Sequence, residues 1–546
     1  MSLDPGFALL ILIVSMSISM AIIPVMIRLA PALGMIDKPD PRKVHAVPIP
    51  RVGGVGIVMG ALIPLLIWPV GGHLLHSFLF GALVLLVFGV WDDAKELGHY
   101  VKFIGQFVAV IAVVYYGDLY VTHLPFLSTD AINPTVGRLF TVVAMVGMIN
   151  AINHSDGLDG LAGGESLLSL GAILYLGYQV SDPLVTLVCV ATVGGVFGFL
   201  RFNSHPARVF MGDGGSQFLG FTLGFLAVYL TQVSNTALSP ALPALLLGLP
   251  VVDIIAVLIQ RVAGGMNWFL ATKNHIHHRL LELGFKHYQS VMAIYSVQAL
   301  FVICAVLMPY ESDALILGIY FGVTALVFGV LSTAEHVHWR MQTNHRDDAL
   351  GHLMAAFTPN SPLMIVDRGI IKAFLVAFLV FGAVFVTRIP RDLALAGAVL
   401  FALLLVRLLV GYRVWFLFLR LIIYVSLAFV SYLVEEYSPP LMVDYPSLSH
   451  VFYGALALLV ILAVRYSAEE SFMASPLDFL VVLIVLALGA MTKGGVAGVE
   501  MVSMVIHLIV LFYGAEVIIK HMTNRWNAFT LAVLFALGVL AARGYA

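Results

Sequence analysis

The polar segment NHSDGLDGLAGG, residues 153–164, lies between two long apolar runs and contains two aspartates, Asp156 and Asp159. With Asn153, these acids follow one another at three-residue steps, so a helical turn would place all three side chains on one face. Carboxylate and amide oxygens are hard ligands that suit Mg²⁺ or the hydroxyl groups of a nucleotide. The segment therefore predicts a metal or nucleotide site, and the alternative is a polar loop that only turns the chain.

A second pair of acids, Asp92 and Asp93, ends an apolar run in WDDAKELG, residues 91–98. Neighbouring carboxylates repel each other unless a cation lies close to them, and Lys95 follows the pair here. Such a pair at the end of a long apolar run indicates a divalent metal, a general base or both. The alternative is a helix end with two solvated acids.

Asp213 lies among glycines in FNSHPARVFMGDGGSQFLG, residues 202–220, directly before a predicted helix. Helix N-termini attract phosphate groups, and an acid at this position can ligate Mg²⁺ beside them. The sequence therefore predicts Asp213 as a metal ligand, with a plain glycine turn as the alternative.

Three histidines, His275, His277 and His278, cluster with Lys273 and Arg279 in KNHIHHRLLELGF. Histidines can bind zinc, but imidazoles beside lysine and arginine suit a phosphate or sugar better. We therefore expect an anionic ligand here. A zinc site and a solvated basic loop are the alternatives.

A proline-rich basic loop, residues 37–54, contains Arg42, Lys43, His45 and Arg51. These cations fit contact with an anionic substrate or a lipid phosphate. The alternative is that they only fix the orientation of the chain in the membrane.

Segments that are apolar enough to cross a membrane lie between these motifs. Of the 546 residues, 61% are hydrophobic and 11% are charged, and the mean hydropathy is +1.01. Runs of about 17–25 apolar residues predict transmembrane helices, and they are too long for barrel strands. We expect an all-α polytopic membrane protein that is embedded in the lipid bilayer and has no nucleic-acid partner. The first eleven spans are expected at residues 6–30, 53–70, 74–91, 103–117, 136–152, 163–180, 184–200, 216–231, 241–260, 290–309 and 314–332.

A polar break at residues 333–369 precedes a second apolar region. We expect a membrane domain at 1–335, a cytoplasmic linker or interfacial segment at 336–369, and an additional transmembrane domain at 370–546. Seven further spans are expected near residues 370–388, 393–410, 414–433, 450–465, 478–492, 501–519 and 527–542.

Lysine and arginine are distributed very unequally between the two sides of the first domain. Up to residue 290, thirteen of them lie near the loops that follow odd-numbered spans, and Arg138 alone lies on the other side. Positively charged loops stay in the cytoplasm. The five polar motifs therefore share the cytoplasmic face, where their acids and cations predict a site for Mg²⁺ and phosphates and hence phosphoryl transfer.

A transporter would place its ionisable groups in mid-span, near broken helices. The motifs of residues 1–335 lie at span ends instead, which disfavours that class for the first domain. For the second domain a transporter-like function stays open, with MTKGGVAGVE, residues 491–500, as the one suggestive break.

Taken together, WDDAKELG, NAINHSDGLDGLAGG, FNSHPARVFMGDGGS and HIHHRL resemble the motifs of the polyprenyl-phosphate N-acetylhexosamine-1-phosphate transferases, in order and in spacing. The resemblance covers roughly residues 1–335, the family's eleven-helix core. It implies an Mg²⁺-dependent enzyme, with Mn²⁺ as the alternative ion, that moves a sugar-1-phosphate from a UDP-sugar to undecaprenyl phosphate and releases UMP. Such an enzyme begins the synthesis of a cell-envelope polysaccharide such as O-antigen.

The resemblance also implies roles for individual residues. Asp213 and Asp156 would ligate the metal. Asp92 would act as a base on the lipid phosphate or orient it, and Asp93 would assist at the metal or diphosphate. Asp156 and Asp159 would take part in catalysis at the nucleotide and diphosphate. The remaining expected substrate-binding residues are Lys43, His45, Asn153, Asn203, His275, His277, His278 and Arg279.

The HIHH sequence favours a donor such as UDP-N-acetylglucosamine. The alternative is the UDP-MurNAc-pentapeptide reaction of peptidoglycan synthesis, whose enzymes typically carry a Thr-Pro-Thr-Met-Gly-Gly loop where this chain has IPRVGG. The resemblance places the protein in the bacterial inner membrane, with the active site facing the cytoplasm. A homodimer is left open, and residues 370–546 have no counterpart in the ordinary enzyme.

Overall fold

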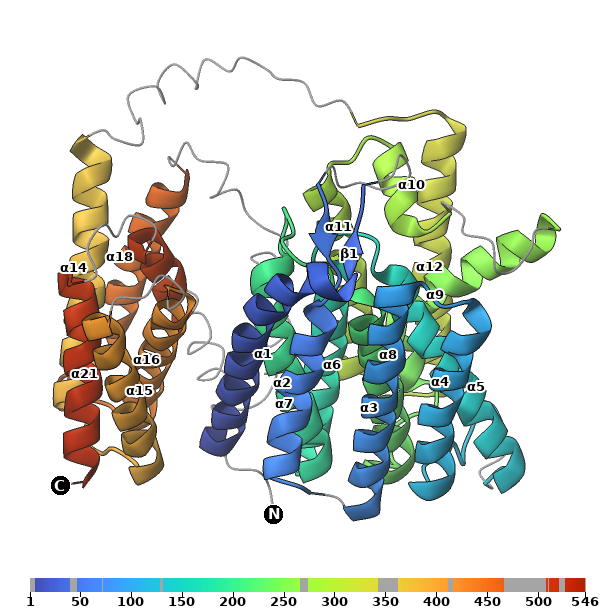
Figure 1. Cartoon of the computed structure of the whole chain (residues 1–546), viewed down its shortest axis with the longest axis horizontal. Helices are drawn as coiled ribbons and strands as arrows, with labels where there is room; N and C mark the ends of the chain where they lie inside the picture. The colour runs from blue at the N-terminus through green and yellow to red at the C-terminus, as the bar shows by residue number, and fades with distance from the viewer. Residues whose placement is uncertain are drawn as a thin grey trace. The chain divides into compact units, whose positions relative to one another are not determined.

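The computed structural model describes residues 5–39, 47–70, 72–127, 131–265, 274–341, 362–410, 416–465, 507–508, 510–519 and 526–545. These residues are almost entirely helical (Figure 1), which confirms the prediction of an all-α fold. Within this part of the chain, the named strands are β1 (Ile36–Asp37) and β2 (Ile49–Pro50), which pair antiparallel. Helix α10 and this short sheet lie at the same end of the first unit, at the top of Figure 1.

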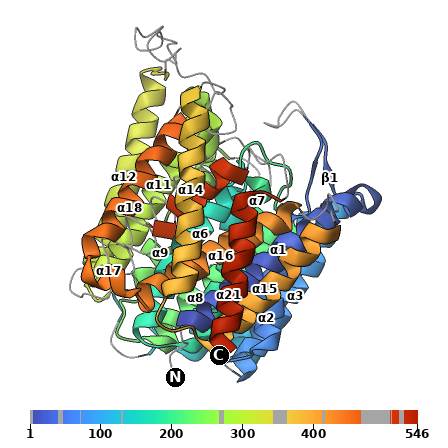
Figure 2. The same ribbon diagram turned by 90° about the vertical axis from the view of Figure 1, so that its left-hand side faces the viewer.

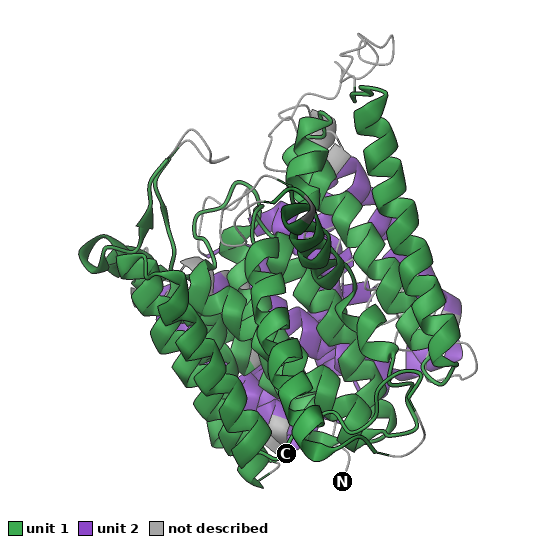
Figure 3. Ribbon diagram, turned by 90° about the vertical axis from the view of Figure 1, so that its right-hand side faces the viewer, with its two compact units in different colours: residues 1–343, 475–491 green, residues 344–474, 492–546 purple. Residues whose placement is uncertain are grey.

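The chain divides into two compact units (Figure 3), residues 1–343 with 475–491 and residues 344–474 with 492–546. The predicted boundary at residues 336–369 falls largely on residues outside the described ranges and stays a prediction. The helices of the first unit are α1 (Pro5–Leu33), α2 (Gly53–Ile67), α3 (Gly72–Lys95), α4 (His99–Ile111), α5 (Pro134–Ser155), α6 (Leu161–Gln179), α7 (Pro183–Asn203), α8 (Gly212–Tyr229), α9 (Leu242–Ala263), α10 (Ile276–Glu282), α11 (His287–Leu307) and α12 (Asp313–His336). Short π-helices η1 (Ala112–Tyr116) and η2 (Leu230–Ser234) extend α4 and α8.

Eleven of the described helices are long and apolar enough to cross a membrane. Ten of them lie within residues 14–336, and the eleventh is Val366–Phe385. The span expected at residues 53–70 is the 15-residue helix α2, which is shorter than the roughly 20 residues of a full crossing.

Small residues let α1, α2 and α7 pack closely (Figure 1). A Cβ at Gly60 would lie 2.8 Å from the Ser15 carbonyl oxygen, and one at Gly195 would lie 2.6 Å from the Ile57 carbonyl oxygen. Ser19 adds a hydrogen bond of 2.9 Å from its hydroxyl to the Gly195 carbonyl. Where the surroundings of a helix are as apolar as its side chains, such close backbone approach supplies much of the packing energy.

Helix α9 is kinked at Gly248, where φ is +28° and ψ is −114°. Pro250 cannot donate a backbone hydrogen bond, and the kink frees the Leu249 N–H. The side chain of Gln298, on α11, accepts that N–H at 2.9 Å and donates to Ser169 Oγ at 3.0 Å. A buried glutamine therefore stabilises the bend that directs the second half of α9 toward α10.

The second unit contains α14 (Pro362–Phe385), α15 (Arg391–Val410), α16 (Phe416–Glu436), α17 (Pro440–Asp444), α18 (Pro446–Arg465) and α21 (Ala528–Tyr545). Helix α14 packs against α16, α18 and α21 (Figure 2). The predicted span at 478–492 lies outside the described residues.

Arg543 donates to three carbonyls at the end of α14, those of Ala383, Val384 and Val386, at 2.7–3.0 Å. These carbonyls have no partner inside their helix, so the guanidinium stabilises the helix end.

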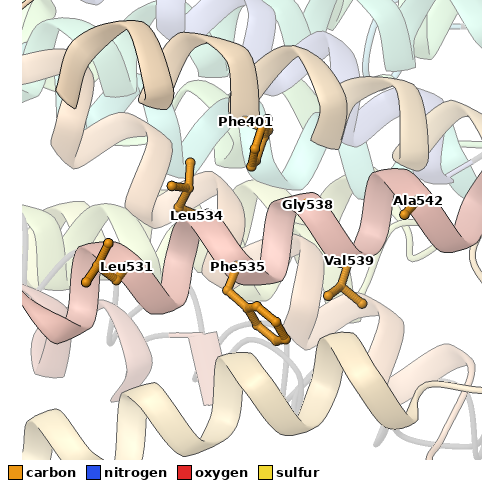
Figure 4. A pocket seen from close by; sticks show the side chains of 7 residues that line it. All are labelled: Phe401, Leu531, Leu534, Phe535, Gly538, Val539 and Ala542. Carbon is orange, nitrogen blue, oxygen red and sulfur yellow. The ribbon is translucent and has the colours of Figure 1, made fainter. Parts of the chain in front are cut away.

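A pocket in this unit lies between α15 and α21 (Figure 4). Its lining is wholly apolar: Phe401, Leu531, Leu534, Phe535, Gly538, Val539 and Ala542. It contains no acid, base or hydrogen-bonding side chain, so it is suited to apolar contact and not to catalysis.

Candidate active site

Lys102 joins the acids of two separate motifs. Its Nζ lies 2.7 Å from Asp92 Oδ2, at the end of α3, and 2.9 Å from Asp213 Oδ2, at the start of α8. The structure thus brings the WDDAKELG and MGDGGS motifs together, as the sequence predicts. The cation at the paired acids is Lys102 in α4, where the sequence suggested Lys95.

Asp93 accepts hydrogen bonds from the backbone N–H groups of Asp213 and Gly214, at 3.0 and 3.4 Å. These N–H groups belong to the first turn of α8, so Asp93 stabilises the positive end of that helix. Gly212 has φ +70°, and a Cβ there would lie 2.5 Å from Asp93 Oδ2. Asp93 therefore positions Asp213. Its carboxylate also accepts hydrogen bonds from backbone N–H groups that we expected to be available to a phosphate.

Asn153 extends this cluster from the last turn of α5. Its Nδ2 donates to Asp213 Oδ1 at 3.2 Å and to Ser216 Oγ at 2.8 Å. Gln217 donates to the other oxygen of Asp213 at 3.2 Å. Carboxylates and two amides from three helices thus converge with one ammonium group, and this oxygen-rich donor set is the kind that Mg²⁺ takes in proteins.

Asp156 follows the last residue of α5 and has non-helical backbone angles, φ −76° and ψ 53°. Burial, together with the charges of Asp213 and Asp159, raises its pKa to about 7. A divalent cation would favour the charged carboxylate, because an opposite charge lowers the pKa of an acid. This environment therefore suits the predicted role of Asp156 beside a metal.

Asp159 lies beyond the end of α5, so the expectation that it shares a helical face with Asn153 and Asp156 was wrong. Its Oδ2 accepts from His205 Nδ1 at 2.7 Å and from the Ala207 N–H at 3.1 Å. Both partners belong to the loop between α7 and α8. The sequence did not reveal this connection between loops, because the three-residue spacing of the motif continues to Asp159 although the helix ends at Ser155.

Asn203 also joins two loops. Its Oδ1 accepts the Gly160 N–H at 2.8 Å, and its Nδ2 donates to the Val209 carbonyl at 2.9 Å. The side chain is almost fully buried. The structure therefore gives Asn203 a positioning role, and its predicted contact with substrate stays a prediction.

The histidines of the HIHH motif lie at the start of α10, and His277 packs on Gly157 of the 156–160 loop. A Cβ at Gly157 would lie 2.5 Å from Cε1 of His277 and closer still to its Nε2. Burial and the neighbouring His278 and His275 lower the pKa of His277 well below its usual value. His277 is therefore a neutral imidazole at physiological pH, so it can form hydrogen bonds but contributes no positive charge.

Asp253 holds His275, which the sequence predicts at the site. Its Oδ2 lies 2.7 Å from His275 Nδ1, and its Oδ1 accepts the Ile276 N–H at 2.9 Å. The carboxylate thus fixes the imidazole and the start of α10 at once. Asp253 is the second residue, after Lys102, that the sequence analysis missed, because it lies inside an apolar helix and outside every polar motif.

Arg279 forms a bidentate pair with Glu335 of α12, with its Nε and one terminal nitrogen at 2.7 and 2.8 Å from the two carboxylate oxygens. This pair fastens α10 to α12, and the predicted contact of Arg279 with substrate stays a prediction. The predicted contact of His278 with substrate also stays a prediction. Lys43 and His45 lie outside the described residues.

The similarity to known proteins covers the part of the chain that carries this candidate site. The family model for glycosyl transferase family 4 matches residues 75–231. A probable undecaprenyl-phosphate N-acetylglucosaminyl 1-phosphate transferase of Bacillus subtilis is 33% identical over 313 residues, 57% of this chain and 87% of the relative. An undecaprenyl-phosphate alpha-N-acetylglucosaminyl 1-phosphate transferase of Haemophilus influenzae is 32% identical over 291 residues, 52% of this chain and 80% of the relative. The Escherichia coli K12 protein of that name is 30% identical over 292 residues, 52% of this chain and 79% of the relative.

Proposed function

The chain belongs to glycosyl transferase family 4, the polyprenyl-phosphate N-acetylhexosamine-1-phosphate transferases, and from this premise we propose its reaction. It transfers a sugar-1-phosphate, N-acetylglucosamine-1-phosphate or that of a related N-acetylhexosamine, from a UDP-sugar to undecaprenyl phosphate. UMP is the second product. The relatives' names support the acceptor and the sugar phosphate, and the UDP donor and the release of UMP are proposed with them.

The Asp92–Lys102–Asp213 cluster is the observation that most supports this reaction. Phosphoryl transfer needs groups that position the phosphates and neutralise their charge, and it needs little covalent chemistry from the protein. Lys102 can contact a phosphate oxygen, and Asp213 and Asp156 can hold Mg²⁺. When bound, that ion would draw charge from the diphosphate and align it with the acceptor.

We propose direct attack. An oxygen of the undecaprenyl phosphate forms a bond to the phosphorus that carries the sugar. The bond from that phosphorus to the oxygen bridging it to UMP breaks, and UMP leaves with the bonding electrons. Asp92 orients the lipid phosphate or accepts its remaining proton. The lipid phosphate is already an anionic nucleophile, so no intermediate on an aspartate is needed.

The site is proposed to face the cytoplasm of a bacterial inner membrane. The support for this is the excess of lysine and arginine on the side of the first domain that carries the motifs. UDP-sugars are cytoplasmic metabolites, so the donor and the site would lie in the same compartment.

The direct test uses the purified full-length protein with undecaprenyl phosphate, Mg²⁺ and a panel of UDP-sugars, and it measures released UMP. We expect UMP with UDP-N-acetylglucosamine or a close relative, and none when the lipid is left out. Release of UMP with UDP-MurNAc-pentapeptide alone would move the protein to peptidoglycan synthesis. A folded protein that releases none with any donor would contradict the proposal.

A further inference from the structure

Asp159, His205 and His287 form a second cluster of metal-binding groups, separate from the hydrogen-bonded group around Lys102. They come from three segments: the loop after α5, the loop after α7 and the first residue of α11. One ligand atom from each lies within 4.8 Å of the other two. The proposed reaction uses neither His205 nor His287.

The individual distances show how the cluster is built. Asp159 Oδ2 lies 2.7 Å from His205 Nδ1 and 4.0 Å from His287 Nε2. The two imidazole rings are nearly parallel, with centroids 4.1 Å apart and planes at 21°, so each ring directs a nitrogen toward the same carboxylate. His287 Nε2 also lies 3.4 Å from the Asp159 carbonyl oxygen.

Hydrogen bonding alone explains this arrangement incompletely, because His287 Nε2 approaches Asp159 only at 3.4 Å from its carbonyl oxygen and at 4.0 Å from Oδ2. Asp159 and His287 are also mostly buried, with side-chain exposures of 15% and 11%, while His205 is 44% exposed. The cluster is therefore open to solvent on one side only.

We propose that Asp159, His205 and His287 bind a divalent transition-metal ion such as zinc, at a site distinct from that of Mg²⁺. Two imidazole nitrogens and one carboxylate oxygen suit zinc and its neighbours, whereas Mg²⁺ prefers oxygen ligands alone. Zinc bonds of about 2.0–2.2 Å place ligand atoms roughly 3.3 Å apart. Rotation of the partly exposed His205 and a small shift of His287 would reach that spacing. The fourth position would hold water or an anion.

Cobalt(II) is the probe that tests this site without reference to turnover. The full-length protein, stripped with a chelator and held in excess Mg²⁺ to occupy the carboxylate cluster, is titrated with Co²⁺. Visible d–d absorption reports a four- or five-coordinate ion with nitrogen ligands, and elemental analysis after desalting gives the stoichiometry of zinc. We expect one ion per chain.

Two single variants and two matched controls locate the ion. His205→Ala and His287→Ala should each weaken binding by more than the roughly 10–100-fold typical of losing an outer-shell partner. His76→Ala removes an exposed imidazole far along the chain from the cluster, and His278→Ala removes one from the HIHH motif. Both controls should bind as the wild type does, and thermal unfolding checks that all four variants are folded.

Three results would overturn the proposal. The first is the absence of d–d bands in the wild type. The second is a spectrum that survives both His205→Ala and His287→Ala. The third is loss of binding in His278→Ala alone, which would move the ion to the HIHH histidines. In each case the three residues would be a hydrogen-bonded latch between loops.

Discussion

Lys102 is the residue on which the candidate site depends most. Its ammonium lies between Asp92 and Asp213 and compensates the repulsion of two carboxylates from different helices. Paired acids in the sequence implied a nearby cation, and the structure identifies which one it is. Lys95, the closer choice along the chain, is exposed.

Replacing Lys102 with methionine should leave the protein folded and lower UMP release by about 10²–10³-fold, the usual effect of removing one group that stabilises developing charge. Lys95→Met serves as the control and should keep nearly wild-type turnover. Near-wild-type turnover in the Lys102 variant would remove this lysine from the machinery.

Asp156 should give the protein a stability that depends on pH. Its pKa rises from 3.8 in the unfolded chain to about 7 in the folded one. The folded state therefore holds the proton more tightly, so stability is greatest below pH 4 and falls as pH rises toward 7. In the absence of Mg²⁺, the thermal midpoint of the wild type should fall across this range relative to that of Asp156→Asn. Equal slopes for the two proteins would show that Asp156 does not titrate in this way.

Several independent contacts hold helix α10 in place, and one of them joins it to the 156–160 loop. Asp253 of α9 fixes the start of α10, and Glu335 of α12 pairs with Arg279. Gly157 of the loop packs against His277. The histidines of a short helix can reach a site in the neighbouring loop only if these contacts are kept. The sequence predicted the histidines and not the contacts, because the partners lie on distant apolar helices.

Gly157→Ala tests this docking. The added methyl group would overlap the buried His277 ring, so the ring or the start of α10 must shift. We expect turnover to fall by about tenfold or more, as for other displacements of a positioned group. Gly147→Ala is the matched control, because a Cβ there meets nothing within 4 Å. Hydrogen exchange at residues 276–282 should rise in the first variant only. Unchanged exchange and turnover in Gly157→Ala would mean that the loop and α10 act independently.

On the scale of the whole molecule, a transferase core is joined to a second unit without an assigned role. The relatives cover 52–57% of the chain. The second unit has polar contacts of its own, such as His507 Nδ1 to Glu435 Oε1 at 2.6 Å. A homodimer stays open.

A chain ended after residue 345 should therefore keep part of the transferase activity when it is reconstituted in lipid. UMP release and a cooperative thermal transition are the measurements. A truncated protein that folds but releases no UMP would show that residues after 345, which include 475–491 of the first unit, belong to the catalytic unit.

Sequence reasoning succeeded where one local pattern determines the outcome. Long apolar runs predicted the helices, because lipid leaves the backbone few alternatives. The shared face of the acidic motifs predicted that Asp92, Asn153 and Asp213 lie close together, while their roles stay predictions. Sequence reasoning failed where the neighbouring residues in the chain give no indication of a side chain's partner. Lys102 and Asp253 are single charges in apolar helices, and Asp159 lies past a helix end that the three-residue spacing conceals.

The most direct test of the central claim is Mg²⁺-dependent, lipid-dependent release of UMP by the wild type and by Asp213→Ala, measured side by side on proteins with matching thermal unfolding. Asp213 contacts Lys102 and Asn153 and is positioned by Asp93, so its loss should abolish turnover at any Mg²⁺ concentration. Wild-type turnover in this variant would contradict the account of the site.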